Sequence, residues 1–247
     1  MREGAISKFA PSLTVGLPPQ APTAGVRPEG ALIKTMNDTY SDSEKSPEQL
    51  NSRHALGQLL NDMISFPERR TEIAQNIENT FGQCKAVLTL DMSGFSRTTQ
   101  QHGIISFLLM IHQMQLICRP CVEHFGGTVI KTDADNLFCL FDTVADAVRA
   151  SQEIISRLNA ANTVLPADRQ LYVAFGIGYG KILNIGDEDI FGDEMNLACK
   201  LGEDIAEKGE ILLTPAAMAE LNGSGMAMRE GAISISGIHL NYYYVEG

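Results

Sequence analysis

From residue 85 onward, the hydrophobic positions of this chain follow two different periodicities. Short apolar runs bounded by polar residues predict β-strands, and longer segments with apolar residues three or four apart predict helices. In order, the predicted elements are strand 85–92, helix 104–124, strands 128–132 and 136–141, helix 144–160, and strands 171–179 and 181–185. The order strand, helix, strand, strand, helix, strand is that of a ferredoxin-like α+β core.

Additional strands and helices follow this core. The pattern predicts helix 195–207, strand 211–214, helix 216–221, and strands 233–235 and 240–245. The glycine-rich string GIGYG at 176–180 closes an apolar run without opening a helix. We therefore interpret it as a hairpin turn rather than as a phosphate-binding loop.

Two segments precede the main domain, which we expect over residues 84–247. Residues 1–45 are rich in Pro, Gly, Ser and Thr without sustained periodicity, which predicts a disordered tail. Residues 46–83 show helical periodicity interrupted at Pro67, which predicts a helical lead-in. Two arrangements fit its apolar faces. In one, the lead-in packs on a partner chain or on an upstream face of the domain; in the other, it is a helix that covers its own domain.

The charge balance and the apolar runs exclude several function classes. Lys and Arg total 19 against 30 Asp and Glu, a net charge of -11, which leaves no broad basic surface for nucleic acid. The longest apolar run falls well short of the ~20 residues of a membrane span. The N-terminus lacks the apolar core of a secretory signal. We expect a cytoplasmic protein with no nucleic-acid partner and no membrane span.

The five cysteines are an odd number, scattered through apolar segments, which is typical of reduced thiols in a cytosolic protein. Cys118 and Cys121 form a CxxC inside the predicted helix 104–124, and no second CxxC completes a zinc site. We expect both to pack in the core, with a redox or metal role as the alternative.

Two carboxylates stand where predicted strands end. Asp91 ends the apolar run in LTLDMSGFS, and Asp135 lies in the hairpin of GTVIKTDADNLFCLF. A strand, a helix and a second strand make a βαβ unit, whose right-handed crossover sets the strands in parallel, adjacent or one strand apart. Asp91 and Asp135 should then meet at one edge of the sheet, where repelling carboxylates favour a shared Mg²⁺ or Mn²⁺. The pattern predicts a two-metal phosphate site.

Three segments together resemble the catalytic domain of the class III nucleotidyl cyclases, over roughly residues 85–245. LDMSGFS resembles the family's first metal motif, an aspartate followed by a variable pair and Gly-Phe. KTDADN resembles its hairpin, a Lys-Thr with a second metal aspartate four residues after the Lys. EDIFGDEMNLACKL at 188–201 resembles its Asp-hydrophobic-aromatic-Gly, followed by Asn and a basic residue four further on.

The resemblance implies a role for each matching residue. Asp91 and Asp135 would hold two Mg²⁺ or Mn²⁺ ions, with the backbone carbonyl of Met92 as a further ligand. Lys131 would donate to a ring nitrogen of the purine, and Asp189 would accept from an exocyclic amine. This donor and acceptor pattern favours adenine over guanine.

The resemblance also implies residues for the ribose and the phosphates, and a dimer. Asn196 would orient the ribose and Lys200 would neutralise phosphate charge; four residues apart on a helix, they would share one face. Family members form head-to-tail dimers with metal residues from one chain and base and ribose residues from the other. Because this chain holds both sets, a homodimer with two equivalent sites is implied.

Two positions depart from the family's pattern. Lys200 stands where the family usually has Arg, and a lysine lacks the planar bidentate fork, which favours slow turnover. Asp133 stands where the family usually has an apolar residue. We expect it to be a solvated turn aspartate, with a ligand or supporting role in the metal site as the alternative.

The function these motifs imply is that of an adenylate cyclase, in which the 3′ hydroxyl of ATP attacks its own α-phosphorus and pyrophosphate leaves. Two alternatives stay open: a cyclase for another nucleotide, GTP or a pyrimidine triphosphate, and a catalytically weak nucleotide-binding dimerisation module, which Lys200 favours. An RNA-binding ferredoxin-like module would need aromatic strand platforms and positive charge, which this chain lacks.

Overall fold

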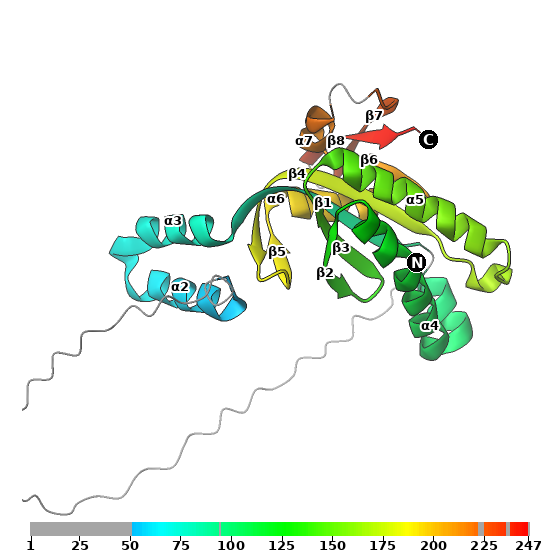
Figure 1. Ribbon diagram of the computed structural model, residues 1–247, viewed down its shortest axis with the longest axis horizontal. Coiled ribbons are helices and arrows are strands. Elements are labelled where there is room, and N and C mark those ends of the chain that lie inside the picture. Colours follow the sequence, from blue (N-terminus) through cyan, green and yellow to red (C-terminus); the bar gives the residue numbers. More distant parts are fainter. Residues whose placement is uncertain (1–50, 94, 222–224, 236–237, 247) are drawn as a thin grey trace, which may run out of the picture. The chain divides into compact units, whose positions relative to one another are not determined.

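One mixed β-sheet of eight strands organises the part of the chain that the structure describes (Figure 1). This computed structural model describes residues 51–246, apart from 94, 222–224 and 236–237. The predicted tail at 1–45 lies outside the described residues. The strand order is β2-β3-β1-β4-β6-β8-β7, and β5 pairs with β4 outside that path.

The first six elements of the sheet domain form the ferredoxin-like core. They are β1 (Gly82–Met92), α4 (Phe95–His124), β2 (Thr128–Asp133), β3 (Asn136–Phe141), α5 (Val144–Asn162) and β4 (Val173–Ile185). β1 is antiparallel to both β3 and β4, and β3 separates it from β2. β1 and β2 therefore run parallel, one strand apart, which confirms the ferredoxin-like α+β fold and the predicted βαβ unit.

The remaining elements extend this core toward the C-terminus. They are β5 (Asp189–Phe191), α6 (Asp193–Cys199), the π-helical segment η3 (Lys200–Ile205), β6 (Ile211–Leu213), α7 (Pro215–Glu220), β7 (Met228–Ile235) and β8 (Ile238–Val245). β6 runs parallel to β4, and β8 joins it to the edge strand β7. β6, β8 and β7 thus lengthen the sheet on the side away from the β2–β3 hairpin.

The two faces of the sheet bury different side chains. Leu88 and Leu90 of β1 belong to the largest core cluster, which α4 and α5 cover. Val87 belongs to a separate cluster, against which Met195 and Cys199 of α6 pack. Because successive side chains of a strand point to opposite faces, Asp91 lies on the same face as Val87, toward α6.

The predicted hairpin turn at 176–180 is wrong. β4 continues unbroken through this string and pairs with β1 on both sides of it. A Cβ at Gly176 would overlap the carbonyl oxygen of Ala198, and one at Gly178 would lie 2.5 Å from that of Glu194. The glycines therefore allow the backbone of α6 to lie directly on the strand.

Two helices, α2 (Arg53–Ser65) and α3 (Arg70–Phe81), precede β1. The buried side of α3 packs against Ile185 at the end of β4; it consists of Ile73, Ile77 and Phe81. α3 thus packs against its own domain, one of the two arrangements expected, while α2 keeps Ile64 72% exposed. The division into segments 1–45, 46–83 and 84–247 stays a prediction.

The long helix α4 carries the CxxC in its buried side. Cys118 and Cys121 are both fully buried in the main core cluster, and burial raises the pKa of each thiol. The expectation that this pair packs in the core is confirmed. At the other end of the helix, Gly103 has a φ of 77° and interrupts the helical backbone, so the helix predicted from residue 104 begins after this break.

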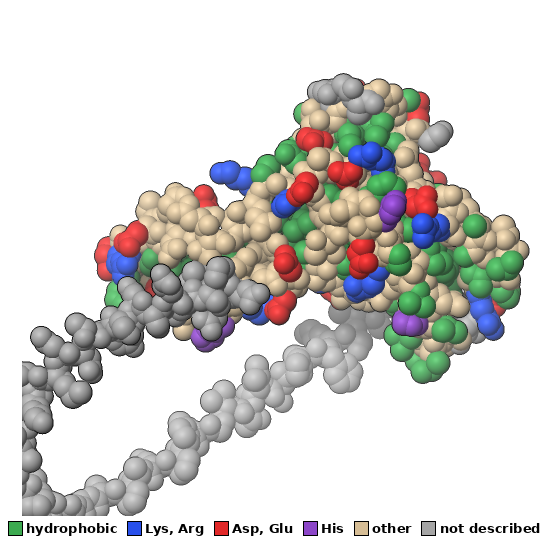
Figure 2. Space-filling view, in the orientation of Figure 1, with side chains coloured by type: hydrophobic (Ala, Val, Ile, Leu, Met, Phe, Trp, Pro, Cys, Tyr) green, Lys and Arg blue, Asp and Glu red, His purple; other side chains and the backbone are tan. Residues whose placement is uncertain are grey.

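Within the described residues, one segment is by length and composition apolar enough to cross a membrane. It is Gly103–His124 of α4, with a mean hydropathy of 1.3, and 33% of its most apolar window is buried in the domain. A search for uninterrupted apolar runs alone does not single out this segment. Scattered polar residues interrupt its apolar run but lower its mean hydropathy only a little. Its exposed side carries Ile104, Ile105 and Leu108, and apolar side chains gather around α4 in Figure 2. The absence of a membrane span stays a prediction.

Candidate active site

The candidate metal ligands Asp91 and Asp135 lie together at one end of the sheet. The pairing of β1 with β3 extends to Leu90 opposite Leu137, so Asp91 follows directly after the paired region. Asp135 lies in the two-residue turn between β2 and β3, where Ala134 has the positive φ of 51° that tight hairpins require. The strand register therefore brings the turn level with the end of β1, as predicted.

Burial and repulsion act on both carboxylates. Burial, Asp135 and Glu203 raise the pKa of Asp91 to about 6, against a smaller opposing effect of the hydrogen bond from the Met92 N–H. Burial also raises the pKa of Asp135, and the nearby charge of Asp133 adds to the shift. A pair with these properties favours a cation that neutralises both charges.

A divalent ion fits this set of oxygen donors. Mg²⁺ is usually held by one or two protein carboxylates and completes its shell with water and substrate phosphates. Among the residues that the structure describes, no group of three or more His, Cys, Asp and Glu is placed to hold a metal. The side-chain oxygen of Asn136, next to Asp135, is buried and has no partner in this part of the chain. An open site that phosphate oxygens complete therefore fits better than a closed one.

The raised pKa of Asp91 predicts a pH dependence of stability in the metal-free protein. Folded Asp91 holds its proton more tightly than unfolded Asp91, so its stabilising contribution is present below pH ~4 and is lost as the pH rises through about 6. Asp91→Asn should therefore raise the melting temperature over wild type more at pH 7.5 than at pH 4.5, measured by scanning fluorimetry with EDTA. Equal melting temperatures of Asp91→Asn and wild type at pH 7.5 would contradict the raised pKa of Asp91.

The base-recognition candidates Lys131 and Asp189 form an ion pair, with 2.7 Å between Lys131 Nζ and Asp189 Oδ1. The register of β2 against β3 shifts between Val129 and Lys131, as a β-bulge causes. A bulge re-aims the side chains beside it. Lys131 Nζ accordingly lies 5.0 Å above the centre of the Phe138 ring, which faces α6. The structure thus brings the two predicted base residues together.

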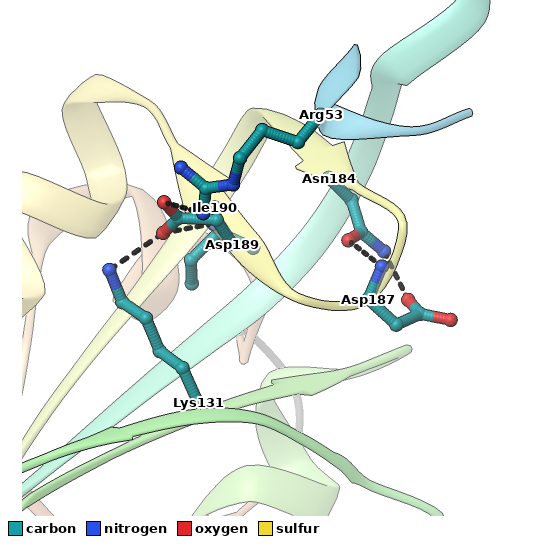
Figure 3. A network of polar contacts seen from close by, with 6 residues as sticks. All are labelled: Arg53, Lys131, Asn184, Asp187, Asp189 and Ile190. Atoms are coloured by element: carbon teal, nitrogen blue, oxygen red, sulfur yellow. Dashed lines mark hydrogen bonds and ion pairs between the residues drawn. The ribbon is translucent and has the colours of Figure 1, made fainter. Parts of the chain in front are cut away.

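Both carboxylate oxygens of Asp189 accept hydrogen bonds. Besides Lys131, Oδ1 accepts from the Ile190 N–H at 3.0 Å, and Oδ2 accepts from Arg53 Nη2 at 2.9 Å (Figure 3). Burial alone would raise the pKa of Asp189, but the hydrogen bonds from Lys131 and Arg53 outweigh it and hold the pKa below its usual range. Asp189 is therefore an ionised acceptor, as recognition of an amine requires.

The turn before β5 is fixed by its own side chains (Figure 3). Asn184 Nδ2 donates to Asp187 Oδ1 at 2.6 Å, and the Asp187 N–H donates to Asn184 Oδ1 at 3.2 Å. Gly186 and Asp187 both have positive φ, of 61° and 54°. These contacts hold the β4–β5 turn, and with it the position of Asp189 at the start of β5.

Asn196 and Lys200 lie one helical turn apart, because the Lys200 N–H donates to the Asn196 carbonyl. The prediction that they share one helix face is confirmed. Asn196 is exposed, whereas the Lys200 side chain is 38% exposed and pairs with Asp204 at 3.4 Å. From Lys200 the helix continues as the π-helical segment η3, a feature frequent at functional sites. Their roles toward ribose and phosphates stay predictions.

Two residues that the sequence analysis did not single out contact the site. Arg53 reaches Asp189 from α2, across 136 residues of sequence. Glu203 of η3 accepts a hydrogen bond from Asn136 Nδ2 at 3.2 Å and adds negative charge beside Asp91. No local pattern marks Arg53. Glu203 lies in an acidic tract, where single carboxylates cannot be told apart by spacing.

Two further polar residues hold α6 on the sheet. Glu194 Oε2 accepts from Thr214 Oγ1 at 2.6 Å and from the Tyr179 N–H at 3.1 Å. Thr89 of β1 is buried, and its Oγ1 donates to the Ala198 carbonyl at 2.9 Å. The helix that carries Asn196 is therefore tied to the same strand that carries Asp91.

No family model matches this chain. Among curated proteins, it is 28% identical over 129 residues to a protein of Rhizobium meliloti (strain 1021) named "Putative adenylate cyclase 3". The match covers 52% of this chain and 22% of that relative, so the chain spans less than a quarter of the relative's length.

Solved structures of cyclases share the fold. The adenylate/guanylate cyclase/hydrolase of Silicibacter pomeroyi is 25% identical, with a TM-score of 0.56 over 67% of this chain and 98% of that chain. The guanylate cyclase domain of RhGC from Catenaria anguillulae, in complex with GTP, is 14% identical, with a TM-score of 0.56 over 66% and 96%. The same fold thus occurs in proteins named for either purine nucleotide.

Proposed function

We propose that this chain, whose fold is that of the class III nucleotidyl cyclase catalytic domains, is an adenylate cyclase that converts ATP to 3′,5′-cyclic AMP and pyrophosphate. One observation carries the proposal. The α6 face of the sheet presents both a partly buried pair of repelling carboxylates, Asp91 and Asp135, and a separate ion pair of Lys131 and Asp189. The carboxylate pair suits divalent ions that bind a triphosphate, and the ion pair suits recognition of a nucleotide base.

The reaction joins the ribose 3′ oxygen to the α-phosphorus and breaks the bond from that phosphorus to pyrophosphate. Asp91 and Asp135 would hold two divalent ions, with the Met92 carbonyl as a further ligand. Mg²⁺ or Mn²⁺ bound there would supply Lewis-acid chemistry, lowering the pKa of the 3′ hydroxyl and neutralising phosphate charge. The protein itself contributes mainly positioning and charge, as phosphoryl transfer generally requires.

The pair of Lys131 and Asp189 supports ATP as the substrate. Lys131 would donate to adenine N1, and Asp189 would accept from the N6 amine. Because the ion pair already holds donor and acceptor side by side, binding needs little further ordering of these side chains. Guanine presents the opposite pattern, a donor at N1 and an acceptor at O6. Its N1–H would face the donor Lys131, and its O6 would face the acceptor Asp189.

Asn196 and Lys200 would serve the ribose and the phosphates of a site completed by a second copy. In a head-to-tail homodimer, the metal residues of one chain would face the base and ribose residues of the other, which gives two equivalent sites. The exposure of Asn196 and the partial exposure of Lys200 support a contact outside their own chain.

The proposal is tested by incubating the purified protein with each of the four nucleoside triphosphates and Mn²⁺, and identifying the products by mass spectrometry. Cyclic AMP should be the main product. Cyclic GMP or a cyclic pyrimidine nucleotide as the main product would show that GTP or a pyrimidine triphosphate is the substrate instead of ATP. If none of the triphosphates gave a cyclic product, the cyclase assignment would be overturned.

A nucleotide-binding dimerisation module with little turnover is the second candidate, and one observation favours it. Lys200 replaces the family's arginine and pairs with Asp204 along the helix surface. A lysine held there supplies a point charge on a flexible stem rather than a planar fork for phosphate oxygens. In this role the site would bind ATP and signal through assembly.

Substitutions at Lys200 distinguish the two candidates. If Lys200 stabilises charge on the transferring phosphate, Lys200→Ala should lower kcat by about 10- to 1000-fold with little change in KM, the pattern of a contact made mainly in the transition state. Lys200→Arg should keep or raise kcat. Asp204→Ala is the matched control, because it removes the surface pair and leaves Lys200 free. An unchanged kcat for Lys200→Ala would show that Lys200 only pairs with Asp204 on the helix surface, an exposed contact worth about 0.3 to 0.5 kcal/mol.

A further inference from the structure

We infer that Arg53 is a third base-recognition residue, which donates a hydrogen bond to N7 of adenine and thereby distinguishes adenine from cytosine. The inference rests on the proposed function, since it concerns the same base site. It assigns to the helical lead-in a direct part in substrate choice.

The geometry places two cations on either side of one carboxylate. Lys131 Nζ lies 2.7 Å from Asp189 Oδ1, and Arg53 Nη2 lies 2.9 Å from Asp189 Oδ2 (Figure 3). The three side chains come from α2, β2 and β5 and converge on the same point. They present donor, acceptor and donor in that order.

Adenine offers the complementary order along one edge. Its N1 accepts, its N6 amine donates and its N7 accepts, whereas guanine offers a donor at N1 followed by acceptors at O6 and N7. Cytosine matches adenine at the first two positions, with an accepting N3 and a donating N4 amine, but it has a C–H where adenine has N7. Lys131 and Asp189 alone would therefore accept cytosine as well as adenine, and a third donor is needed to exclude it.

Arg53 has the reach and the spare donors for this role. Its side chain is 64% exposed, although its partner Asp189 is only 12% exposed, so part of the guanidinium faces the open side of the pair. A guanidinium carries five N–H donors in a fixed plane, and the described ion pair engages Nη2. The group can thus bind Asp189 and a base atom at the same time.

The start of α2 is anchored beside the base site. Asn51 Oδ1 accepts from the Gly186 N–H at 2.8 Å, which joins the residues before α2 to the β4–β5 turn. Ser52 then caps the helix, with its Oγ accepting from the Ala55 N–H at 3.2 Å. Arg53 is the next residue, so these contacts fix its backbone close to Asp189.

The test uses nucleotides that differ only at N7. Equilibrium binding of 3′-deoxy-ATP, which lacks the attacking hydroxyl, is compared with binding of its 7-deaza analogue in the presence of Mg²⁺. Wild type should bind the 7-deaza analogue about 10-fold more weakly, the effect of one charge-assisted hydrogen bond. Arg53→Ala should bind 3′-deoxy-ATP about 10-fold more weakly than wild type and should not distinguish the two nucleotides.

Two further variants serve as controls. Arg53→Lys keeps a charged donor at the site and should retain part of the discrimination at N7. Arg69→Ala removes another exposed arginine of the lead-in, one that pairs with Glu72, and should bind both nucleotides as wild type does. In steady-state assays, Arg53→Ala should raise KM for ATP with kcat nearly unchanged, and should raise the rate of CTP turnover relative to ATP.

Several results would overturn the inference. Equal affinity of wild type for both nucleotides would show that N7 meets no donor. Tighter binding of both by Arg53→Ala would show that Arg53 blocks Asp189 instead of assisting it. Binding of neither nucleotide by wild type would overturn the proposed function, and the role of Arg53 with it.

Discussion

Asp91→Asn and Asp135→Asn should each lower kcat at least about 1000-fold, a loss of about 4 kcal/mol of transition-state stabilisation. Each substitution replaces a charged oxygen ligand with a neutral amide of the same size, so the affinity for the metal should fall. Folding should not suffer, because burial and repulsion already oppose the charge on both carboxylates. Steady-state kinetics with ATP and Mn²⁺ measure the first effect, and melting temperatures measure the second.

Asp133→Asn is the matched control, since Asp133 lies in the same hairpin but is exposed. It should keep activity within about two-fold of wild type, as a solvated turn aspartate would. More than a few per cent of activity in Asp91→Asn would contradict the two-metal assignment. A loss in Asp133→Asn as large as in Asp135→Asn would make Asp133 a ligand as well.

Mixing two inactive variants should restore activity to about a quarter of the wild-type level. Asp91→Ala lacks a metal ligand and Lys131→Ala lacks a base donor, and both should be inactive alone. If the two sets of residues meet across a head-to-tail interface, one of the two sites in each heterodimer is wholly wild type. Random mixing makes about half of the dimers heterodimers, which gives one quarter of the sites overall. Cyclic AMP formation against mixing ratio measures the recovery.

The complementation experiment has its own control within the chain. Asp91→Ala mixed with Asp135→Ala should stay inactive, because no chain in that mixture carries both metal ligands. Exchange into heterodimers is verified with differently tagged copies and native mass spectrometry. Heterodimers without recovered activity would show that metal and base residues of one site come from one chain.

The core fold could be predicted from the sequence because its signals are local. Apolar periodicity distinguishes strands from helices, and the crossover rule then orders β1 and β2 in the sheet. The meeting of Asp91 with Asp135 followed from that order alone. That Lys131 and Asp189 lie together could be expected only from the motifs, which assign both to the base, because a bulge between Val129 and Lys131 sets the direction of the lysine.

What could not be predicted depends on contacts between distant segments. GIGYG has the composition of a turn, yet its glycines are needed because α6 lies against them, and sequence spacing does not show that approach. Arg53 likewise carries no motif, and its contact with Asp189 arises only when the lead-in folds back onto the β4–β5 turn. Apolar spacing predicted the helix from residue 104, directly after the break at Gly103, but it did not predict the helical residues from Phe95 that precede the break.

The pairing of β1 with β3 has a consequence for how such a site can diverge. The separation of Asp91 from Asp135 is set by backbone hydrogen bonds between strands, which most substitutions leave in place. If Arg53, Lys131 and Asp189 recognise the base as proposed, a change of base would instead require exchanges at these three side chains, which α2, β2 and β5 supply. Under the proposed function, such exchanges would alter nucleotide preference one residue at a time and would leave the positions of Asp91 and Asp135 unchanged.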